Sequence, residues 1–125
     1  MDRRYVLSAF GYAIIGLLLG IYMAASRDHG QLVTHAHIML VGFVVSFVYG
    51  LCHRLWLEKR ASTLSSVQFY IHHGGTLVLL SGLFLYYGDY IDLETIDPVL
   101  GIASVIVLIG VILMSVMLLK AEQTS

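Results

Sequence analysis

Residues 30–52 read GQLVTHAHIMLVGFVVSFVYGLC, a run of 23 residues without Asp, Glu, Lys or Arg. A helix needs roughly 20 apolar residues to cross a hydrocarbon core about 30 Å thick. Three other stretches pass the same test when histidine is counted as neutral: Tyr5–Ser26, Ala61–Gly88 and Pro98–Leu119. We therefore predict an all-α membrane protein with four transmembrane helices in an up-and-down bundle. The expected helices cover about 5–26, 31–55, 63–87 and 98–119 of a single domain, residues 1–125.

The composition supports a membrane protein and excludes several other classes. Of the 125 residues, 58% are hydrophobic and 12% are charged, whereas a soluble domain averages about 45–50% and 25%. A disordered chain needs low hydrophobicity and high net charge. The net charge of −1 supplies no basic field, so we expect no nucleic-acid partner. The single cysteine, Cys52, excludes an intrachain disulfide and a CxxC motif. The expected environment is the lipid bilayer.

The basic residues predict how the bundle is oriented. Six of the seven lie at the termini or in the connection between the second and third spans: Arg3, Arg4, Arg54, Lys59, Arg60 and Lys120. The other connections carry Arg27 and an acidic segment, residues 89–97. The positive-inside rule then places both termini in the cytoplasm of a multi-pass protein of the inner (plasma) membrane. In the acidic segment, Asp97-Pro98 predicts the start of the last helix, with an Asp cap and Pro in the first turn.

Histidines are the candidate functional residues, because four of the six lie within predicted spans. Ionisable residues at membrane depth are costly, and they normally face a cavity, a partner or a cofactor. The four are His35, His37, His72 and His73. We interpret His29 as a solvated residue of the first outer turn, and His53 as an interfacial residue beside Arg54.

His35 and His37 lie two residues apart in the second predicted span. At 100° per residue their side chains point about 200° apart, so they cannot both face one site. A uniform α-helical projection places Gly42, Ser46 and His53 on the same stripe of the helix as His35. It places Val41, Val44, Val48 and Leu55 near His37. We therefore expect this helix to be covered on both faces, which a four-helix unit achieves by forming an oligomer.

His72 and His73 precede two glycines in the third predicted span. Glycine lets another helix or a flat ligand approach closely. His72 shares a polar stripe with Gln68 and Thr76 and is predicted to face the bundle, whereas His73 is rotated by about 100°. Two interpretations stay open: a polar packing patch, or ligation of haem or copper by neutral imidazole.

Depth limits which histidines can share a metal. His35 lies about 12 Å outward of the middle of its helix, and His72 lies about 5 Å inward of the middle of its own, at 1.5 Å per residue. A gap of about 17 Å is too large for two imidazoles on one iron. A bis-histidine site is therefore expected to pair the second span with the same span of a neighbouring copy.

Two segments resemble subunit I of the haem–copper oxidase and nitric oxide reductase superfamily. They are Thr34-His35-Ala36-His37-Ile38-Met39-Leu40-Val41-Gly42-Phe43 and Phe69-Tyr70-Ile71-His72-His73-Gly74. They cover the second and third spans, about half of the chain. The other two spans match only in hydropathy.

This resemblance implies a haem protein built from repeated units. Subunit I of that family has twelve helices in three groups of four, and one helix carries a His-x-His that serves two neighbouring pores. The chain looks like one such group, so a homotrimer would rebuild the arrangement. His35 of one protomer and His37 of the next would be the axial ligands of haem b. The chain departs from the family in its spans, which hold no carboxylate or lysine. His72-His73 is also too deep to match the family's paired copper histidines.

Three functions follow as hypotheses. The first is a haem b protein for electron transfer or diatomic-gas handling, with a respiratory-chain redox partner and His35, His37 and His72 as cofactor-binding candidates. The second is a metal- or haem-handling assembly factor, with copper as the alternative metal at the four histidines. The third is a cofactor-free structural subunit of a respiratory complex. An independent enzyme has the least support, because the sequence shows no Ser-His-Asp set, no paired intramembrane carboxylates and no phosphate loop.

Overall fold

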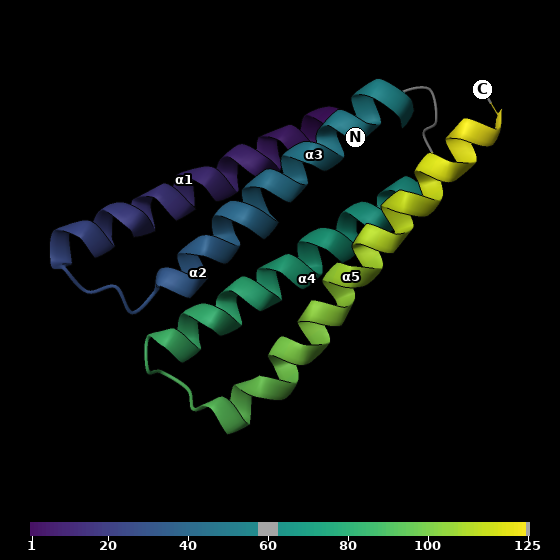
Figure 1. Ribbon diagram of the computed structural model, residues 1–125. Coiled ribbons are helices and arrows are strands. Elements are labelled where there is room, and N and C mark those ends of the chain that lie inside the picture. The colour runs from purple at the N-terminus through teal and green to yellow at the C-terminus, as the bar shows by residue number, and fades with distance from the viewer. Residues whose placement is uncertain (58–62, 125) are drawn as a thin grey trace.

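The structure, a computed structural model, describes residues 1–57 and 63–124. It confirms four long helices, and the described residues contain no strand. The first is α1 (Asp2–Ser26), the third is α4 (Thr63–Tyr87) and the fourth is α5 (Leu93–Thr124). The second is one continuous helical rod made of α2 (Leu32–His37), η1 (Ile38–Val44), α3 (Val45–Cys52) and η2 (His53–Leu57) (Figure 1).

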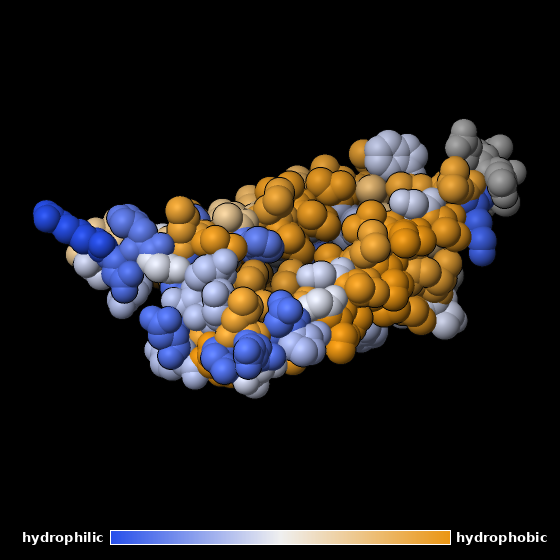
Figure 2. All heavy atoms as spheres, turned by 60° about the horizontal axis from the view of Figure 1, so that its bottom comes forward, coloured by the Kyte–Doolittle hydropathy of each residue, from blue (hydrophilic) through white to orange (hydrophobic). Residues whose placement is uncertain are grey.

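All four helices are long and apolar enough to cross a membrane. Large hydrophobic side chains lie on the outside of the bundle, including Ile21 on α1 and Ile102 on α5, which are 65% and 64% exposed. Hydrophobic side chains dominate the body of the face in Figure 2, and hydrophilic ones gather mostly at its ends. Such exposure is unfavourable in water and favourable in lipid. The chain is therefore a multi-pass membrane protein.

The bundle is arranged as two helical hairpins (Figure 1). In the first hairpin, α1 packs along α2, η1 and α3; in the second, α4 packs along α5. Contacts between α2 and α4 and between η2 and α5 join the hairpins. Both chain termini lie at the same end of the bundle. For convenience, this end is called the terminal end, and the end with the turns at residues 27–31 and 88–92 is called the turn end.

Two parts of the second rod, η1 and η2, are π-helical. A π turn takes in about one more residue than an α turn, so residues beyond it are displaced around the axis by about 100°. The predicted stripe of His35 and Ser46 therefore differs from the structure. His35 contacts α1 through Gly16, whereas Ser46 contacts α4 through His72. The uniform projection failed because it assumed α-helical geometry throughout.

The last helix begins at Leu93, five residues before Pro98. The Asp97-Pro98 pair predicted the start, but Asp92 provides the cap: its side chain accepts a hydrogen bond from the Thr95 N–H at 3.3 Å. That is the usual geometry of an N-cap. Pro98 lies inside the helix and removes one main-chain donor near its beginning. The sequence offered two acidic caps, and the earlier one is used.

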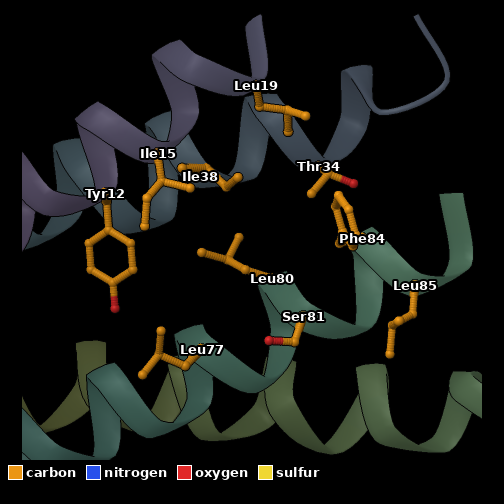
Figure 3. A pocket seen from close by; sticks show the side chains of 10 residues that line it. All are labelled: Tyr12, Ile15, Leu19, Thr34, Ile38, Leu77, Leu80, Ser81, Phe84 and Leu85. Carbon is orange, nitrogen blue, oxygen red and sulfur yellow. The ribbon is translucent and has the colours of Figure 1, made fainter. Parts of the chain in front are cut away.

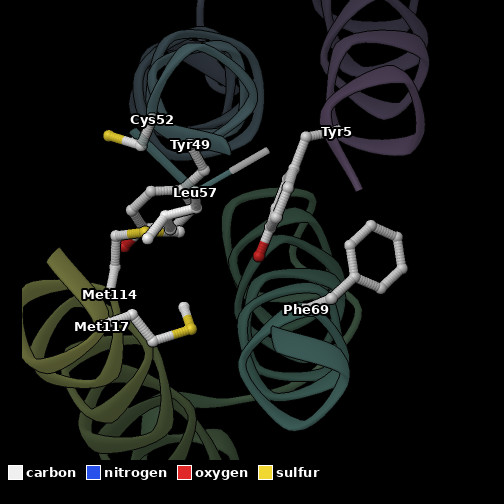
Figure 4. Close-up of a cluster of buried hydrophobic side chains, with 7 residues drawn as sticks. All are labelled: Tyr5, Tyr49, Cys52, Leu57, Phe69, Met114 and Met117. Carbon is white, nitrogen blue, oxygen red and sulfur yellow. The ribbon is translucent and has the colours of Figure 1, made fainter. Parts of the chain in front are cut away.

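The largest apolar core lies at the terminal end, where both hairpins meet (Figure 4). Tyr5 of α1 and Tyr49 of α3 contact Phe69 of α4 and the sulfur-containing side chains of α5, Met114 and Met117. Methionine is flexible and polarizable, so it fills the irregular space among aromatic rings. This core fixes the position of Tyr5, which also belongs to the polar cluster described next.

Candidate functional site

His35 lies in the groove between α2 and α1. Its Nδ1 is 2.8 Å from the carbonyl oxygen of Gly16, and its ring lies over Gly20, where a Cβ atom would come within 3.1 Å of the imidazole. Met39, one turn later, lies over Gly16 in the same way. Two glycines one turn apart on α1 therefore make the space into which His35 and Met39 pack.

His37 faces a different direction. Its Nδ1 is 2.8 Å from the carbonyl oxygen of Val33 in its own helix. His35 thus contacts the neighbouring helix, while His37 bonds only within its own helix in the described contacts. The two imidazoles diverge within one protomer, in agreement with their two-residue spacing in an α-helix.

The hydrogen bonds fix the same tautomer in both rings. A carbonyl oxygen only accepts, so the Nδ1 of His35 and of His37 must each carry the proton. The Nε2 atom of each neutral ring then holds a lone pair. Metal-binding histidines commonly have this arrangement, in which the other ring N–H donates to a backbone carbonyl. In both rings Nε2 is therefore the nitrogen without a proton.

A second group of polar side chains lies inside the bundle nearer the terminal end, and we call it the inner cluster. It comprises Tyr5, Tyr12, Ser46, Tyr49, His53, Gln68, His72, His73 and Thr76. Eight of the nine are exposed over less than a tenth of their surface, His72 at 0%, and His73 is half-buried. The prediction that His72 faces the bundle is confirmed.

Three hydrogen bonds of the inner cluster join the first hairpin to the second. Ser46 Oγ and His72 Nε2 are 2.8 Å apart, and Tyr12 Oη and His73 Nδ1 are 2.9 Å apart. The Tyr5 hydroxyl donates to Oε1 of Gln68. Gln68 also donates through Nε2 to the carbonyl oxygen of Gly110 on α5 at 3.0 Å. These hydrogen bonds thus connect α4 to each of the other three rods.

Aromatic contacts hold the inner cluster together. The His72 and His73 ring centroids are 4.9 Å apart, and Tyr5 stacks on His53 with centroids 5.6 Å apart. His53 was interpreted as interfacial, but it is 3% exposed, while its neighbour Arg54 forms an ion pair with Asp2 at 3.6 Å. The tyrosines were not singled out from the sequence. Their signal was the seven-residue spacing of Tyr5 and Tyr12, which places both on one face of α1.

Several buried polar atoms of the inner cluster have no hydrogen-bond partner among the described residues. They are Tyr49 Oη, His53 Nε2, His72 Nδ1, His73 Nε2 and Thr76 Oγ1. Buried polar atoms are usually paired with protein or ordered water. Because five such atoms lie in one region, the inner cluster can form hydrogen bonds with a further polar group.

The structure keeps the two histidine regions apart. Ser46 contacts His72 and follows His35 by eleven residues, which is about 16 Å along a helix. No group of three or more His, Cys, Asp or Glu side chains is placed to hold a metal ion within residues 1–57 and 63–124. Within one chain, His72 and His73 therefore lie together, and neither lies beside His35 or His37.

Comparisons with family models, with curated proteins and with solved structures find no match for this chain.

The two adjacent histidines are expected to differ in their effect on stability. His72→Ala removes the partner of the buried Ser46 hydroxyl and opens space beside Gly110, whose added Cβ would lie 3.5 Å from His72 Cα. We expect a loss of about 1–3 kcal/mol in the free energy of unfolding. His73→Ala should cost less, because His73 is only half-buried. Reversible unfolding in mixed micelles measures both, with His29→Ala as the control. A larger loss for His73→Ala would contradict the rotation of α4 described above.

Proposed function

We propose that the protein binds haem b in the membrane and transfers electrons or handles a diatomic gas, as a subunit-I-like unit with the haem held between protomers of a homo-oligomer. The observation that carries the proposal is the tautomer of His35 and His37. Both Nδ1 atoms donate to backbone carbonyls, so both Nε2 lone pairs are available to iron. The resemblance in residues 34–43 and 69–74 adds to this observation.

The donor set fits a haem between copies rather than inside one copy. His35 is held against α1, and His37 bonds within its own helix away from that groove. Each protomer can then give one imidazole to each of two neighbours in a ring. Cyclic symmetry places equivalent residues at equal depth, so the second rods of two neighbouring copies would each hold the haem through one histidine. A trimer agrees with the three-group plan that the resemblance implies.

The chain's own groups would set the properties of such a site. The Gly16 and Val33 carbonyls orient the rings and raise the basicity of Nε2 by accepting the Nδ1 protons. Apolar side chains along the second rod, including Leu40 and Val44, would exclude water and thereby influence the reduction potential. When bound, haem would supply an iron that accepts and donates one electron. Two histidine ligands saturate the iron and favour electron transfer over gas binding.

An optical spectrum of the detergent-solubilised protein tests the proposal. Sharp bands of a reduced, six-coordinate haem b are expected, with one haem per protomer. A colourless protein that contains copper by elemental analysis would favour a metal-handling assembly factor instead. The contact of both His35 and Met39 with α1 is the observation that favours that alternative, since imidazole and thioether suit copper. A protein with neither cofactor would support the cofactor-free structural subunit of a respiratory complex.

We also propose that both termini lie in the cytoplasm of a cell whose plasma membrane holds the protein. The distribution of basic residues supports this orientation. Reporter fusions at Asp92, in the turn before α5, and at the C-terminus should report opposite sides, with the C-terminus inside. Fusions that place these two points on the same side would contradict the four-span topology, and a cytoplasmic Asp92 would reverse the orientation.

A further inference from the structure

A pocket of about 480 Å³ lies between the two hairpins (Figure 3). The first hairpin supplies Tyr12 and Leu19 from α1, Thr34 from α2 and Ile38 from η1, and the second supplies Leu80 and Phe84 from α4, among others. Most of the lining is apolar. Phe84 is 42% exposed on the outside of a bundle whose exposed surface is apolar. The pocket therefore suits a ligand that arrives from the hydrocarbon rather than from water.

Tyr12 connects this pocket to the inner cluster. It lines the pocket and lies 2.9 Å from Nδ1 of His73 through its hydroxyl. In Figure 3 the Tyr12 side chain extends from α1 and directs its hydroxyl toward α4. Nε2 of His73 is buried without a partner among the described residues. The pocket, whose lining is mainly apolar but also includes Thr34 and Ser81, thus has a Tyr–His pair at one side.

The Tyr12–His73 pair can bind either a donor or an acceptor. If Tyr12 donates to Nδ1, its oxygen accepts a hydrogen bond from a ligand hydroxyl. If Nδ1 carries the proton and donates to Tyr12, the Tyr12 hydroxyl donates to a ligand carbonyl. The same two side chains can therefore form a hydrogen bond with either the hydroxyl form or the carbonyl form of a ligand. A hydrocarbon chain would use neither hydrogen-bonding arrangement.

We propose that this pocket binds a membrane quinone or its quinol, with one ring oxygen hydrogen-bonded to Tyr12 and the tail leading into the bilayer. A flat ring with oxygen at its edge matches a mainly apolar pocket with a hydrogen-bonding Tyr–His pair at one side. Tyr12 and Phe84 lie among the lining residues and offer aromatic contact to the ring. Binding of the ring requires no haem.

The inference deepens the proposed function and rests on it for the role of the ligand. Thr34 and Ile38 line the pocket, and His35 lies between them on the same rod. A quinol in the pocket would thus be the reduced carrier nearest to a haem held by His35. The redox partner would then be a lipid-soluble two-electron carrier, whose quinol would give one electron to each of two haems and release its two hydroxyl protons.

Titration calorimetry with decylubiquinone, oxidised and reduced, tests the binding in nanodiscs. We expect saturable binding of both forms, about tenfold weaker in Tyr12→Phe because one hydrogen bond is lost. Leu80→Trp should abolish binding by filling the pocket. Leu108→Trp, at an exposed position on α5, is the matched control and should bind as the unsubstituted protein does. Equal affinity in Leu80→Trp or in Tyr12→Phe would overturn the proposal.

Decylbenzene, which has the tail and ring without oxygens, separates a quinone site from a lipid-filled slot. We expect it to bind at least about tenfold more weakly than decylubiquinone. Equal binding of decylbenzene would overturn the proposal and show that the pocket accepts any apolar chain. His35→Ala distinguishes this proposal from the proposed function: it should lose haem and keep decylubiquinone binding. If the unsubstituted protein bound decylubiquinone but contained no haem, the haem proposal would be wrong and the quinone proposal would stand.

Discussion

His35→Ala and His37→Ala should each remove bis-histidine haem from every site of the oligomer. Each protomer gives one imidazole to either neighbour in the proposed ring, so a single substitution removes one ligand at all interfaces. The unsubstituted particle should hold as many haems as protomers, which is three in a trimer. His29→Ala, in the turn between α1 and α2, is the control and should keep full haem content. Haem quantified against protein, together with the low-spin optical bands, measures the loss.

Mixing the two variants should restore part of the haem. An interface works where a protomer that retains His35 meets one that retains His37, which is about a quarter of interfaces in a random, equal mixture. Co-expression with two different affinity tags isolates the mixed particles, and in a trimer one of their three interfaces should hold haem. A haem-loaded monomer in native mass spectrometry would refute ligation between protomers. So would full haem content in either single variant.

Gln68→Leu should produce a loss of stability as large as that expected for His72→Ala. Gln68 accepts from Tyr5 and donates to Gly110, so the change removes two buried hydrogen bonds and leaves the Tyr5 hydroxyl without a partner. Hydrogen bonds between membrane helices average about 0.6 kcal/mol and reach about 1.7. Because both bonds are fully buried, we expect a loss of about 2 kcal/mol, near the sum of two bonds in the upper half of that range.

A double-mutant cycle with Tyr5→Phe isolates the bond across the hairpins. Once the Tyr5 hydroxyl is gone, Gln68→Leu should cost about 1 kcal/mol less than it does alone, because the two changes share one bond. Tyr70→Phe is the matched control: Tyr70 is 61% exposed and receives a hydrogen bond from Arg4 at the surface. Steric trapping or reversible unfolding gives the free energies. Additive effects of Tyr5→Phe and Gln68→Leu would show that their contact contributes nothing.

The sequence predicted the helices because the physical requirement is local. Charge-free stretches of membrane length are visible directly, and the polar residues Gln68, His72 and Thr76 recur at helical spacing on one face of α4. The divergence of His35 and His37 also follows from their spacing within one regular segment. These conclusions need only the geometry of a single helix.

The hydrogen-bond partners could not be predicted because they depend on how the rods rotate and slide against one another. Close packing at glycine sets these positions; for example, a Cβ at Gly42 would come within 2.7 Å of the Tyr12 ring. The π-helical segments then rotate the half of the second rod nearer the terminal end relative to the half nearer the turn end. No periodicity in the sequence predicted these segments. For the same reason the Ser46–His72 and Tyr12–His73 pairs emerge only from the structure.

The bonds that cross between the hairpins have a consequence for biogenesis. Each hairpin presents two apolar helices and can enter the bilayer as a separate pair, because its main-chain hydrogen bonds are made within its own helices. Until the pairs meet, Ser46 and Tyr12 on one of them and His72 and His73 on the other lack the partners seen in the folded protein. The free-energy cost of exposing polar side chains to lipid is therefore present after the hairpins have inserted and before they dock. Docking of the hairpins, rather than entry into the membrane, is the step at which these side chains gain their hydrogen-bond partners.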